Sequence, residues 1–362
     1  MTVIEQERIR TGGLLTIDVS AVVRNWDTMR RRMGNGRDCG AVVKADCYGL
    51  GATQIAPALA RRGCRVFFVA MPGEGIALRR VLPDPDVAIH VLTGPLDDGT
   101  ELTAHHLTPV LNTPEQLADW QTHAPGRPFT LHVDTGMNRL GMPLSAFMAL
   151  PDSCTPAVVM SHLACADEPG HPLNALQQDR FATARARFPG AVASLSNSAG
   201  MFRGDDFLFD LGRPGIALYG GNPVPGQSNP MHPVVRLDLR VLQVREIDTA
   251  GTVGYGATRP VTPGMRLAIV AAGYADGLLR TLGDQGSGTI HGARVPILGR
   301  VSMDLITFDI SALPAGSVHP GDYVTVLDAH HGIDSLAAEA GTLGYEILTG
   351  LSGRYTRTWT GS

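Results

Sequence analysis

Ala41-Val-Val-Lys-Ala-Asp-Cys-Tyr-Gly-Leu-Gly-Ala52 is the stretch that best predicts both the fold and the chemistry of this chain. It contains Lys44, the only lysine among 362 residues, although lysine and arginine together number 30. An arginine cannot usefully be deprotonated, whereas a desolvated lysine amine can lose its proton and attack a carbonyl to form an imine. Lys44 is therefore a candidate Schiff-base residue. The alternative is a lysine that lies on the surface by chance.

The sequence on either side of Lys44 favours a functional role. Residues 41–43 are apolar, as expected at the end of a buried strand, and Gly49 and Gly51 begin the following turn. Residues 52–62 then carry apolar side chains at helical spacing. Lys44 is thus predicted at the junction of a parallel strand and its helix, where barrel enzymes hold their catalytic residues.

Short apolar segments recur along the first part of the chain, most of them separated by helix-length segments. A first strand is predicted at 14–19 and is followed by a helix to about residue 32. Eight further strands are predicted at 41–44, 65–70, 87–93, 107–111, 129–133, 157–162, 191–195 and 207–210. Eight such units in about 200 residues are typical of a closed (β/α)8 barrel of the TIM type. An open doubly wound sheet is the alternative, but no G-x-G-x-x-G follows the first strand.

The composition changes after residue 219. Residues 220–230 are rich in Gly, Pro and Asn, which is typical of a linker, and residues 234–245 alternate as a strand does. Helical spacing returns only near residues 335–351. We therefore predict a barrel domain over residues 1–229 and a mainly β domain over residues 230–362, with the first strand able to pair with the second domain.

Charge and cysteine usage exclude several classes of protein. The net charge is −4 and no basic run exceeds residues 30–32, which argues against a nucleic-acid partner. No run of about 18 apolar residues and no signal-peptide pattern are found, so we expect a cytoplasmic protein without a membrane partner. The five cysteines form no C-x-x-C pair, which indicates reduced and mostly buried thiols rather than a disulfide framework or a metal site.

Polar residues lie where predicted barrel strands end. The fifth strand is followed by Asp134, Thr135 and Arg139, and the sixth places His162 at its end. For His162 a buried structural histidine is as good an interpretation as a functional one. The seventh and eighth strands are followed by Ser196-Asn-Ser198 and by Leu211-Gly-Arg-Pro-Gly-Ile216.

Barrels commonly bind phosphate after the last two strands, through backbone N–H groups freed by glycine and a nearby hydroxyl. Ser198 with the amides of Gly215 and Ile216 would form such a site, although glycine and proline here could simply form turns. A phosphate site combined with a single lysine points to pyridoxal phosphate, a carbonyl cofactor that carries a phosphate. In the second domain, Tyr255 lies between two glycines, either as a turn aromatic or as a phenol that exchanges a proton with a substrate.

These motifs together resemble the alanine racemase family along nearly the full length of the chain. Residues 44–52 are similar to the family's cofactor-lysine motif. Further matches, in the same order as in the family, are Asp134-Thr-Gly-Met-Asn-Arg-Leu-Gly141, Asn197-Ser-Ala-Gly200, Arg213-Pro-Gly-Ile216, Gly254-Tyr-Gly256, Gly273-Tyr-Ala-Asp-Gly277, Gly299-Arg300 with Met303-Asp304, and Tyr345-Glu346.

The resemblance implies interconversion of L-alanine and D-alanine for cell-wall peptidoglycan by a homodimer with shared active sites. It implies that Lys44 binds pyridoxal 5'-phosphate and acts as one base, with Tyr255 of the partner subunit as the other. The residues that it implies around the cofactor are Tyr48, His162, Asn197, Ser198, Arg213, Gly215, Ile216 and Tyr345, and those around the substrate carboxylate are Arg139 and the backbone of Met303.

One departure concerns His132. Many family members have a lysine there, often carbamylated, and this chain has no second lysine. Another group must therefore orient Arg139. The alternatives to an alanine racemase are a racemase of broader specificity that acts on serine, a non-catalytic pyridoxal phosphate carrier and a basic amino-acid decarboxylase. Tyr255 and the second domain argue against the carrier, and Arg213 argues against the decarboxylase.

Overall fold

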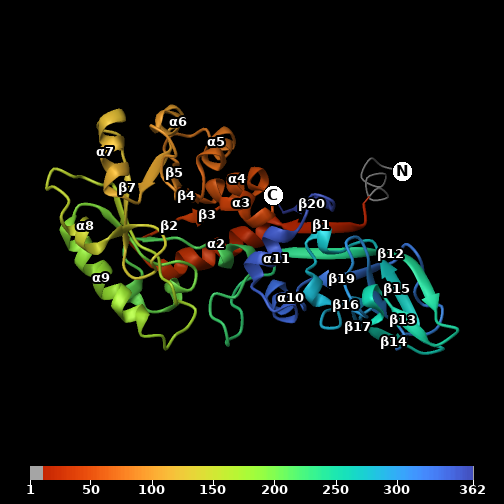
Figure 1. Ribbon diagram of the computed structural model, residues 1–362. Helices are drawn as coiled ribbons and strands as arrows, with labels where there is room; N and C mark the ends of the chain where they lie inside the picture. The colour runs from red at the N-terminus through yellow and green to blue at the C-terminus, as the bar shows by residue number, and fades with distance from the viewer. Residues whose placement is uncertain (1–10, 362) are drawn as a thin grey trace. The chain divides into compact units, whose positions relative to one another are not determined.

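The computed structural model describes residues 11–361, which form two compact units (Figure 1). One unit comprises residues 22–231, and the other comprises the described residues up to Ala21 together with those from His232 onward. Each unit has its own sheet and its own buried core. We call them the barrel unit and the β unit.

The barrel unit is a ring of parallel strands. Seven of them are neighbours in the order β3 (Ala41–Val42), β4 (Val66–Val69), β5 (Ala88–Val91), β6 (Thr108–Leu111), β7 (Thr130–Asp134), β9 (Val158–Met160) and β10 (Val192–Ser194). The ring continues through β11 (Leu211–Gly212), which pairs in parallel with β2 (Asp38–Cys39), just before β3. On its other side the segment after β11 bonds to the segment after β10, because the Arg213 amide donates to the Ser196 carbonyl. The predicted eight-stranded barrel is thus confirmed.

Helices follow most of the strands and lie outside the ring in Figure 1. Their bounds are α2 (Val19–Met33), α3 (Lys44–Gly49), α4 (Ala52–Arg62), α5 (Pro72–Val81), α6 (Thr100–Ala104), α7 (Pro114–His123), α8 (Leu144–Met148) and α9 (Leu173–Arg187). Local sequence explains their ends. The Thr113 side chain caps the amino terminus of α7 and Pro114 occupies its first position, while α4 ends at Gly63 with a φ of 110°.

Several predicted boundaries in this part of the chain are wrong. The strands expected at 87–93 and 157–162 are shorter, namely β5 and β9. The eighth barrel strand was expected at 207–210, but Asp205–Phe207 form a 3-10 turn, η2, and the strand is β11. Phe209 has a φ of 48°, which a strand cannot accommodate. The first strand, β1 (Gly13–Asp18), stops before Val19, which begins α2. The strand expected to reach Lys44 ends at Val42.

The β unit is built on one bent sheet. Its strands follow the order β17 (Ala293–Pro296), β16 (Ser287–Ile290), β19 (Tyr323–Leu327), β12 (Val235–Glu246), β1 and β20 (Thr356–Thr360). The strand β15 (Arg266–Val270) also pairs with β12 and carries β18 (Ile306–Asp309), and β13 (Gly251–Val253) pairs separately with β14 (Arg259–Val261). The strand β1 therefore belongs to this sheet, where the buried residues Leu15 and Leu237 are paired.

The helical segment predicted near 335–351 is two helices, α10 (Ile333–Ala340) and α11 (Gly344–Gly350). Gly341 separates them with a φ of 70°, a conformation that glycine adopts without strain. All five cysteines are free, and four are buried, as the sequence predicts. Within residues 11–361 no helix has the length and apolar character needed to span a membrane.

A buried arginine organises the loops beside α5. The Arg79 guanidinium donates hydrogen bonds to five backbone carbonyls, at 2.7–3.3 Å, in the loops after α5 and α6. The carbonyls are those of Leu82, Asp84, Val87, His105 and His106. No other side chain offers as many donors in a fixed plane, so arginine is specifically required.

We predict that Arg79→Met lowers the free energy of unfolding by about 3 kcal/mol or more, because the carbonyls lose their donors while part of them stays buried. Urea denaturation of the full chain measures this loss. Arg80→Met, at the exposed neighbouring position, serves as the control and should change stability by less than about 0.5 kcal/mol. Equal losses in the two variants would contradict the structural role of Arg79.

Candidate active site

Lys44 begins a short turn of unusual handedness. The four residues that follow it, Ala45 to Tyr48, have φ values of 51°, 54°, 55° and 56° with ψ values of 38–51°. Consecutive left-handed residues are costly for any side chain other than glycine, at roughly 1–2 kcal/mol each. Such a turn persists only when its surroundings hold it, and sites of this kind are often functional.

Contacts from several elements hold the turn. The Asp46 carboxylate accepts a 2.7 Å hydrogen bond from the Ala52 amide, and the Glu74 carboxylate accepts one of 2.8 Å from the Ala45 amide. The Tyr48 ring packs against Tyr219, with 4.7 Å between ring centres. These contacts place Lys44 and Tyr48 on the same turn at the end of the first barrel strand.

The Lys44 amine lies in a setting that lowers its pKa. Partial burial lowers its pKa and the nearby Arg139 guanidinium lowers it further, while Glu74 acts in the opposite direction. A desolvated amine beside another cation loses its proton more readily than an exposed lysine does. This is the state in which an amine attacks a carbonyl.

Arg213 is a buried cation without a carboxylate partner among its described hydrogen bonds. Its guanidinium donates to the Ser194 hydroxyl at 2.5 Å and to the backbone carbonyls of Ser161 and Leu195 at 2.5 and 3.3 Å. Burial lowers its pKa to about 9, so it stays charged at neutral pH. The group can donate a hydrogen bond and cannot accept one.

His132 is neutral and its tautomer is determined by Asn112. The Asn112 amide nitrogen donates to the carbonyls of Leu92 and Val110, so its side-chain oxygen must be the acceptor for His132 Nδ1 at 2.8 Å. Burial, with Arg213 as a second cause, lowers the pKa of His132 to about 3. The proton therefore lies on Nδ1, and Nε2 is a lone-pair acceptor.

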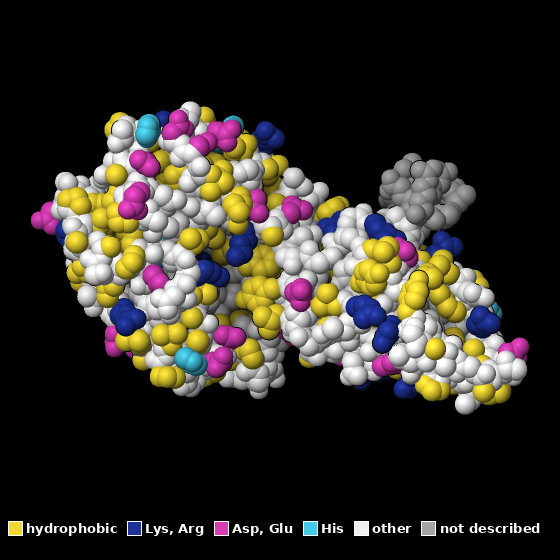
Figure 2. Space-filling view, in the orientation of Figure 1, with side chains coloured by type: hydrophobic (Ala, Val, Ile, Leu, Met, Phe, Trp, Pro, Cys, Tyr) yellow, Lys and Arg dark blue, Asp and Glu magenta, His cyan; other side chains and the backbone are white. Residues whose placement is uncertain are grey.

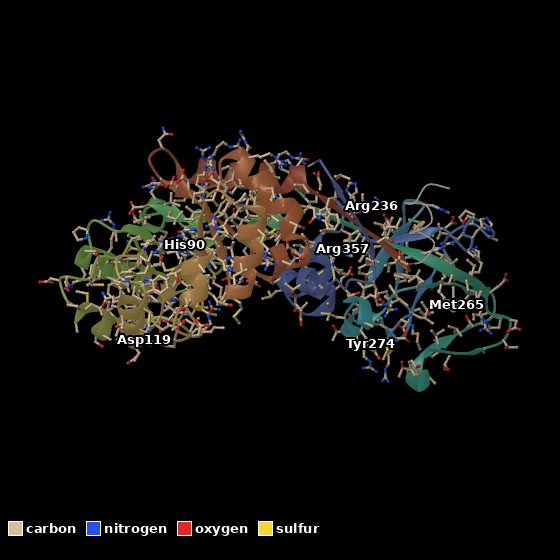
Figure 3. The ribbon with its side chains drawn as sticks, turned by 90° about the horizontal axis from the view of Figure 1, so that it is seen from above. His90, Asp119, Arg236, Met265, Tyr274 and Arg357 are labelled. Atoms are coloured by element: carbon tan, nitrogen blue, oxygen red, sulfur yellow. The ribbon has the colours of Figure 1, made fainter. Side chains whose placement is uncertain are left out.

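His162 is also neutral. Burial lowers its pKa well below the usual range, and the charges of Arg213, Arg139 and Lys44 act in the same direction. Deeper in the barrel, the ring of His90 (labelled in Figure 3) stacks on Phe68 at 4.9 Å, and its pKa falls to about 4 for the same two reasons, burial and Arg213. The histidines therefore add no positive charge at neutral pH.

The predicted phosphate-site residues lie together. The Ser198 hydroxyl accepts hydrogen bonds from the amides of Gly215 at 2.9 Å and Ala217 at 3.3 Å, and a Cβ on Gly215 would lie 2.3 Å from the Tyr48 hydroxyl. Only glycine fits beside Tyr48. Asn197 pairs with Arg213 in a β-bridge, and its side-chain oxygen accepts from the Gly200 amide. Ile216 begins the 3-10 turn η3 (Ile216–Tyr219) directly after Gly215.

Arg139 lies exposed at the end of a tightly bonded loop. The Asp134 carboxylate accepts hydrogen bonds from the amides of Gly136, Met137 and Asn138 at 2.8–3.2 Å, and Asn138 has a φ of 56°. This network determines the course of the loop that leads to Arg139.

The remaining predicted residues lie in the β unit. Tyr255 is 72% exposed in the short turn η4 (Tyr255–Ala257), between two glycines with φ values of 74° and 78°. Met303 and Tyr345 are exposed as well. The Met303 carbonyl accepts the Ala275 amide, and a Cβ on Gly273 would lie 2.4 Å from the same oxygen, so glycine is required there. Tyr274, next to this glycine, is labelled in Figure 3.

Cations and carboxylates both lie near Lys44. The Arg139 charge lowers the pKa of Lys44 and of His162, and Arg213 lowers that of His162, whereas the carboxylates of Glu74 and Asp134 accept hydrogen bonds from backbone amides. On the face seen in Figure 2, basic and acidic side chains are likewise interspersed. The two arginines can donate to a small anionic ligand, and the Lys44 amine can react with a carbonyl on it.

Three residues that form hydrogen bonds to the predicted site residues or their loops were not predicted from the sequence. Asn112, which orients His132, and Gln177, which accepts from the Ala164 amide and donates to the His162 carbonyl, were not singled out. Glu74 was missed as well, although its place three residues into a helix that begins with proline is a recognisable capping pattern. Gln177 offers no such signal, because its partners are far away in sequence.

Comparisons with known proteins agree along the whole chain. The family model described as "Alanine racemase, N-terminal domain" matches residues 17–223, and that described as "Alanine racemase, C-terminal domain" matches residues 234–359. The alanine racemase of Rhodospirillum rubrum is 48% identical over 97% of both chains, and that of Rhizobium meliloti is 45% identical over 98% of both.

A solved structure is similarly close. The crystal structure of alanine racemase from Bartonella henselae with covalently bound pyridoxal phosphate is 37% identical and superposes with a TM-score of 0.91. The match covers 96% of this chain and 99% of the other.

We predict that His132 makes stability depend on pH. An unfolded histidine has a pKa of about 6.5, and in the folded chain the value for His132 is about 3. Between these values the unfolded chain binds a proton that the folded chain does not, so stability falls as pH drops from 7 to 5. His132→Gln should reduce that fall by about 1–2 kcal/mol.

Urea denaturation at pH 7 and pH 5 measures the effect. Part of the pH dependence should persist in His132→Gln, because the buried His90 has a lowered pKa too. The exposed His123 gives a matched control, since His123→Gln should leave the fall unchanged. The account of His132 is wrong if both variants lose as much stability as the original chain.

Proposed function

The chain belongs to the alanine racemase family, and we propose from this premise that it interconverts L-alanine and D-alanine with pyridoxal 5'-phosphate as its cofactor. The observation that carries the proposal is the setting of Lys44. It is the chain's only lysine, its pKa is lowered, and it lies at the end of the first barrel strand among arginines. The enzyme is an isomerase that acts on a small amino acid.

The residues present fit this cofactor. The phosphate would be held by Tyr48, Ser198 and the amides of Gly215 and Ile216, where glycine is sterically required. Asn197 supports this region, and Tyr345 of the β unit is proposed as a further phosphate ligand. When bound, pyridoxal phosphate delocalises the negative charge that is left on the substrate when its α-proton is removed.

Arg213 is proposed to face the pyridine nitrogen of the cofactor. Because its pKa of about 9 keeps it charged, it would donate a hydrogen bond to that nitrogen and would not readily pass a proton to it. A carboxylic acid at this position would protonate the nitrogen instead. We infer that Arg213 limits side reactions such as transamination by weakening the electron sink.

Racemisation requires two bases on opposite faces of the substrate. A proton leaves the α-carbon on one face and another is delivered on the other, so a single base cannot readily serve both. We assign Lys44 Nζ to one face and the Tyr255 hydroxyl to the other. We propose that His162, which is neutral, assists proton exchange at Tyr255, and we assign Arg139 with the Met303 amide to the substrate carboxylate.

We further propose that Tyr255 acts on the substrate in the site that contains Lys44 of a second copy of the chain. Its side chain is 72% exposed within the β unit, so it is available to a partner. The active enzyme is then a homodimer with shared sites. A cytoplasmic location and a role in supplying D-alanine for peptidoglycan are proposed on the same family grounds.

A racemase of broader specificity and a non-catalytic carrier are the alternatives. The match to the racemase C-terminal domain model over residues 234–359 argues against a carrier, which would have no use for Tyr255. The named relatives argue for alanine over serine as the substrate.

We predict that Lys44→Ala abolishes both covalent attachment of the cofactor and racemisation. Borohydride treatment followed by mass spectrometry should locate pyridoxyl phosphate on Lys44 in the original chain and nowhere in the variant.

Tyr255→Phe should keep the covalent cofactor but racemise about 10²–10⁴-fold more slowly.

Exchange of α-deuterium from each alanine enantiomer separates the two bases. In Tyr255→Phe the exchange should fall more for one enantiomer than for the other, because one face keeps its base. Tyr323→Phe, in the same unit, is the control and should behave as the original chain does. Retention of full racemisation by Tyr255→Phe would exclude Tyr255 as a base.

We predict that a mixture of two inactive variants regains activity if the sites are shared. A dimer of one Lys44→Ala subunit and one Tyr255→Phe subunit has one site with both defects and one with neither. Random exchange of subunits should restore about one quarter of the original activity, since half of the dimers are mixed. The test is to unfold and refold an equimolar mixture. Absence of recovery, with refolding shown for the original chain, would rule out shared sites.

A further inference from the structure

Glu74 bonds to two successive units of the barrel at once. One carboxylate oxygen accepts from the Ala70 amide at 2.7 Å and the Met71 amide at 3.3 Å, at the end of its own strand β4. The other oxygen accepts from the Ala45 amide at 2.8 Å, in the turn that follows β3 and carries Lys44. Three amides from two units therefore converge on one side chain.

Gln116 occupies a position that matches that of Glu74, two strand-and-helix units further along the chain. Gln116 is the third residue of α7, as Glu74 is of α5, and both helices begin with proline. The Gln116 oxygen accepts from the amide four residues earlier, Asn112, at 2.7 Å, as Glu74 does from Ala70. The other arm of Gln116 also reaches the loop of the preceding unit, where it donates to the Thr93 carbonyl at 3.1 Å.

The two side chains differ as their partners require. The loop that faces Gln116 offers a carbonyl, which needs an amide N–H, whereas the turn that faces Glu74 offers the Ala45 N–H, which needs an acceptor. The difference arises at Ala45, because this residue is the first of the four left-handed residues in the turn. A glutamine at position 74 would place an NH₂ group against an N–H on one side or the other.

We propose that Glu74 is a positioning residue that holds the left-handed turn after Lys44 and so directs the Lys44 amine into the barrel. The proposal rests on the function proposed above, because it takes Lys44 as the amine that holds the cofactor. Glu74 itself touches neither cofactor nor substrate. It acts by accepting the first amide of a turn whose four residues oppose their preferred handedness.

The charge of Glu74 has a second effect on the same amine. It raises the pKa of Lys44, whereas burial and Arg139 lower that pKa. The charge of Lys44 in turn lowers the pKa of His162, which is neutral. Removing the carboxylate should therefore lower the pKa of Lys44 as well as loosen the turn. A helix cap without a positioning role would change stability and, through its charge, the pKa of Lys44, but it would leave the attachment of the cofactor unchanged.

Glu74→Gln in the full-length chain tests the proposal in two ways. Because Lys44 is the only lysine, a chain grown with lysine labelled with ¹³C at Cε gives one lysine signal, and its pH titration after removal of the cofactor follows Lys44 directly. We expect the midpoint to move to lower pH. The pyridoxal phosphate concentration needed for half-maximal covalent attachment should rise roughly tenfold or more, as for loss of one charge-assisted hydrogen bond.

Gln116→Glu is the matched control. It places a carboxylate oxygen against the Thr93 carbonyl and so creates the corresponding mismatch three strands from β3 in the ring. It should lower thermal stability to a similar extent while leaving the Lys44 midpoint unchanged. Unchanged cofactor attachment in Glu74→Gln would overturn the proposal, as would an equal loss of attachment in the control.

A second variant tests the link to backbone conformation and covers the case in which Glu74→Gln folds poorly. Ala45→Gly removes the penalty of a positive φ at that position, so in combination with Glu74→Gln it should recover part of the lost cofactor attachment. No recovery would refute the role in holding the turn. If the original chain does not racemise alanine, the proposed function fails, whereas the comparison of Lys44 midpoints remains valid.

Discussion

The reversed handedness of the turn after Lys44 is the constraint on which the site depends. Four successive residues with side chains adopt φ values of 51–56°, at a cost of roughly 1–2 kcal/mol each. The surrounding barrel must supply this energy through the Asp46 and Glu74 carboxylates and the packing of Tyr48 on Tyr219. The same turn carries both Lys44 and Tyr48, so one backbone feature places the two residues that we propose to hold the carbonyl and phosphate ends of the cofactor.

Charge in the barrel is arranged around that turn. Arg213 and Arg139 carry positive charge, whereas burial keeps His132 and His162 neutral. The arginines can therefore bind anions while the two histidines stay unprotonated. His132 has a proton determined by Asn112 and a free lone pair on Nε2.

Most of the fold could be predicted because its signals are local. Apolar runs at 65–70 and 129–133 became β4 and β7 since strands buried on both faces need continuous apolar side chains. The eighth strand was misplaced for a reason that composition does not reveal, namely the positive φ of Phe209. The pairing of β1 with β12 required knowledge of residues more than two hundred positions away.

The sequence by itself determined which residues could do chemistry, namely one lysine at a strand end and polar residues and glycines after successive strands. That a Cβ at positions 215 and 273 would collide with Tyr48 or Met303 is visible only in the folded chain. Only the tertiary structure decided how those residues are tuned. Groups that are distant in sequence determine the tautomer of His132, lower the pKa of Lys44 and make the hydrogen bond between the Ala45 amide and the Glu74 carboxylate. Desolvation and hydrogen-bond partners depend on which side chains the closed barrel brings together, and no local pattern encodes that.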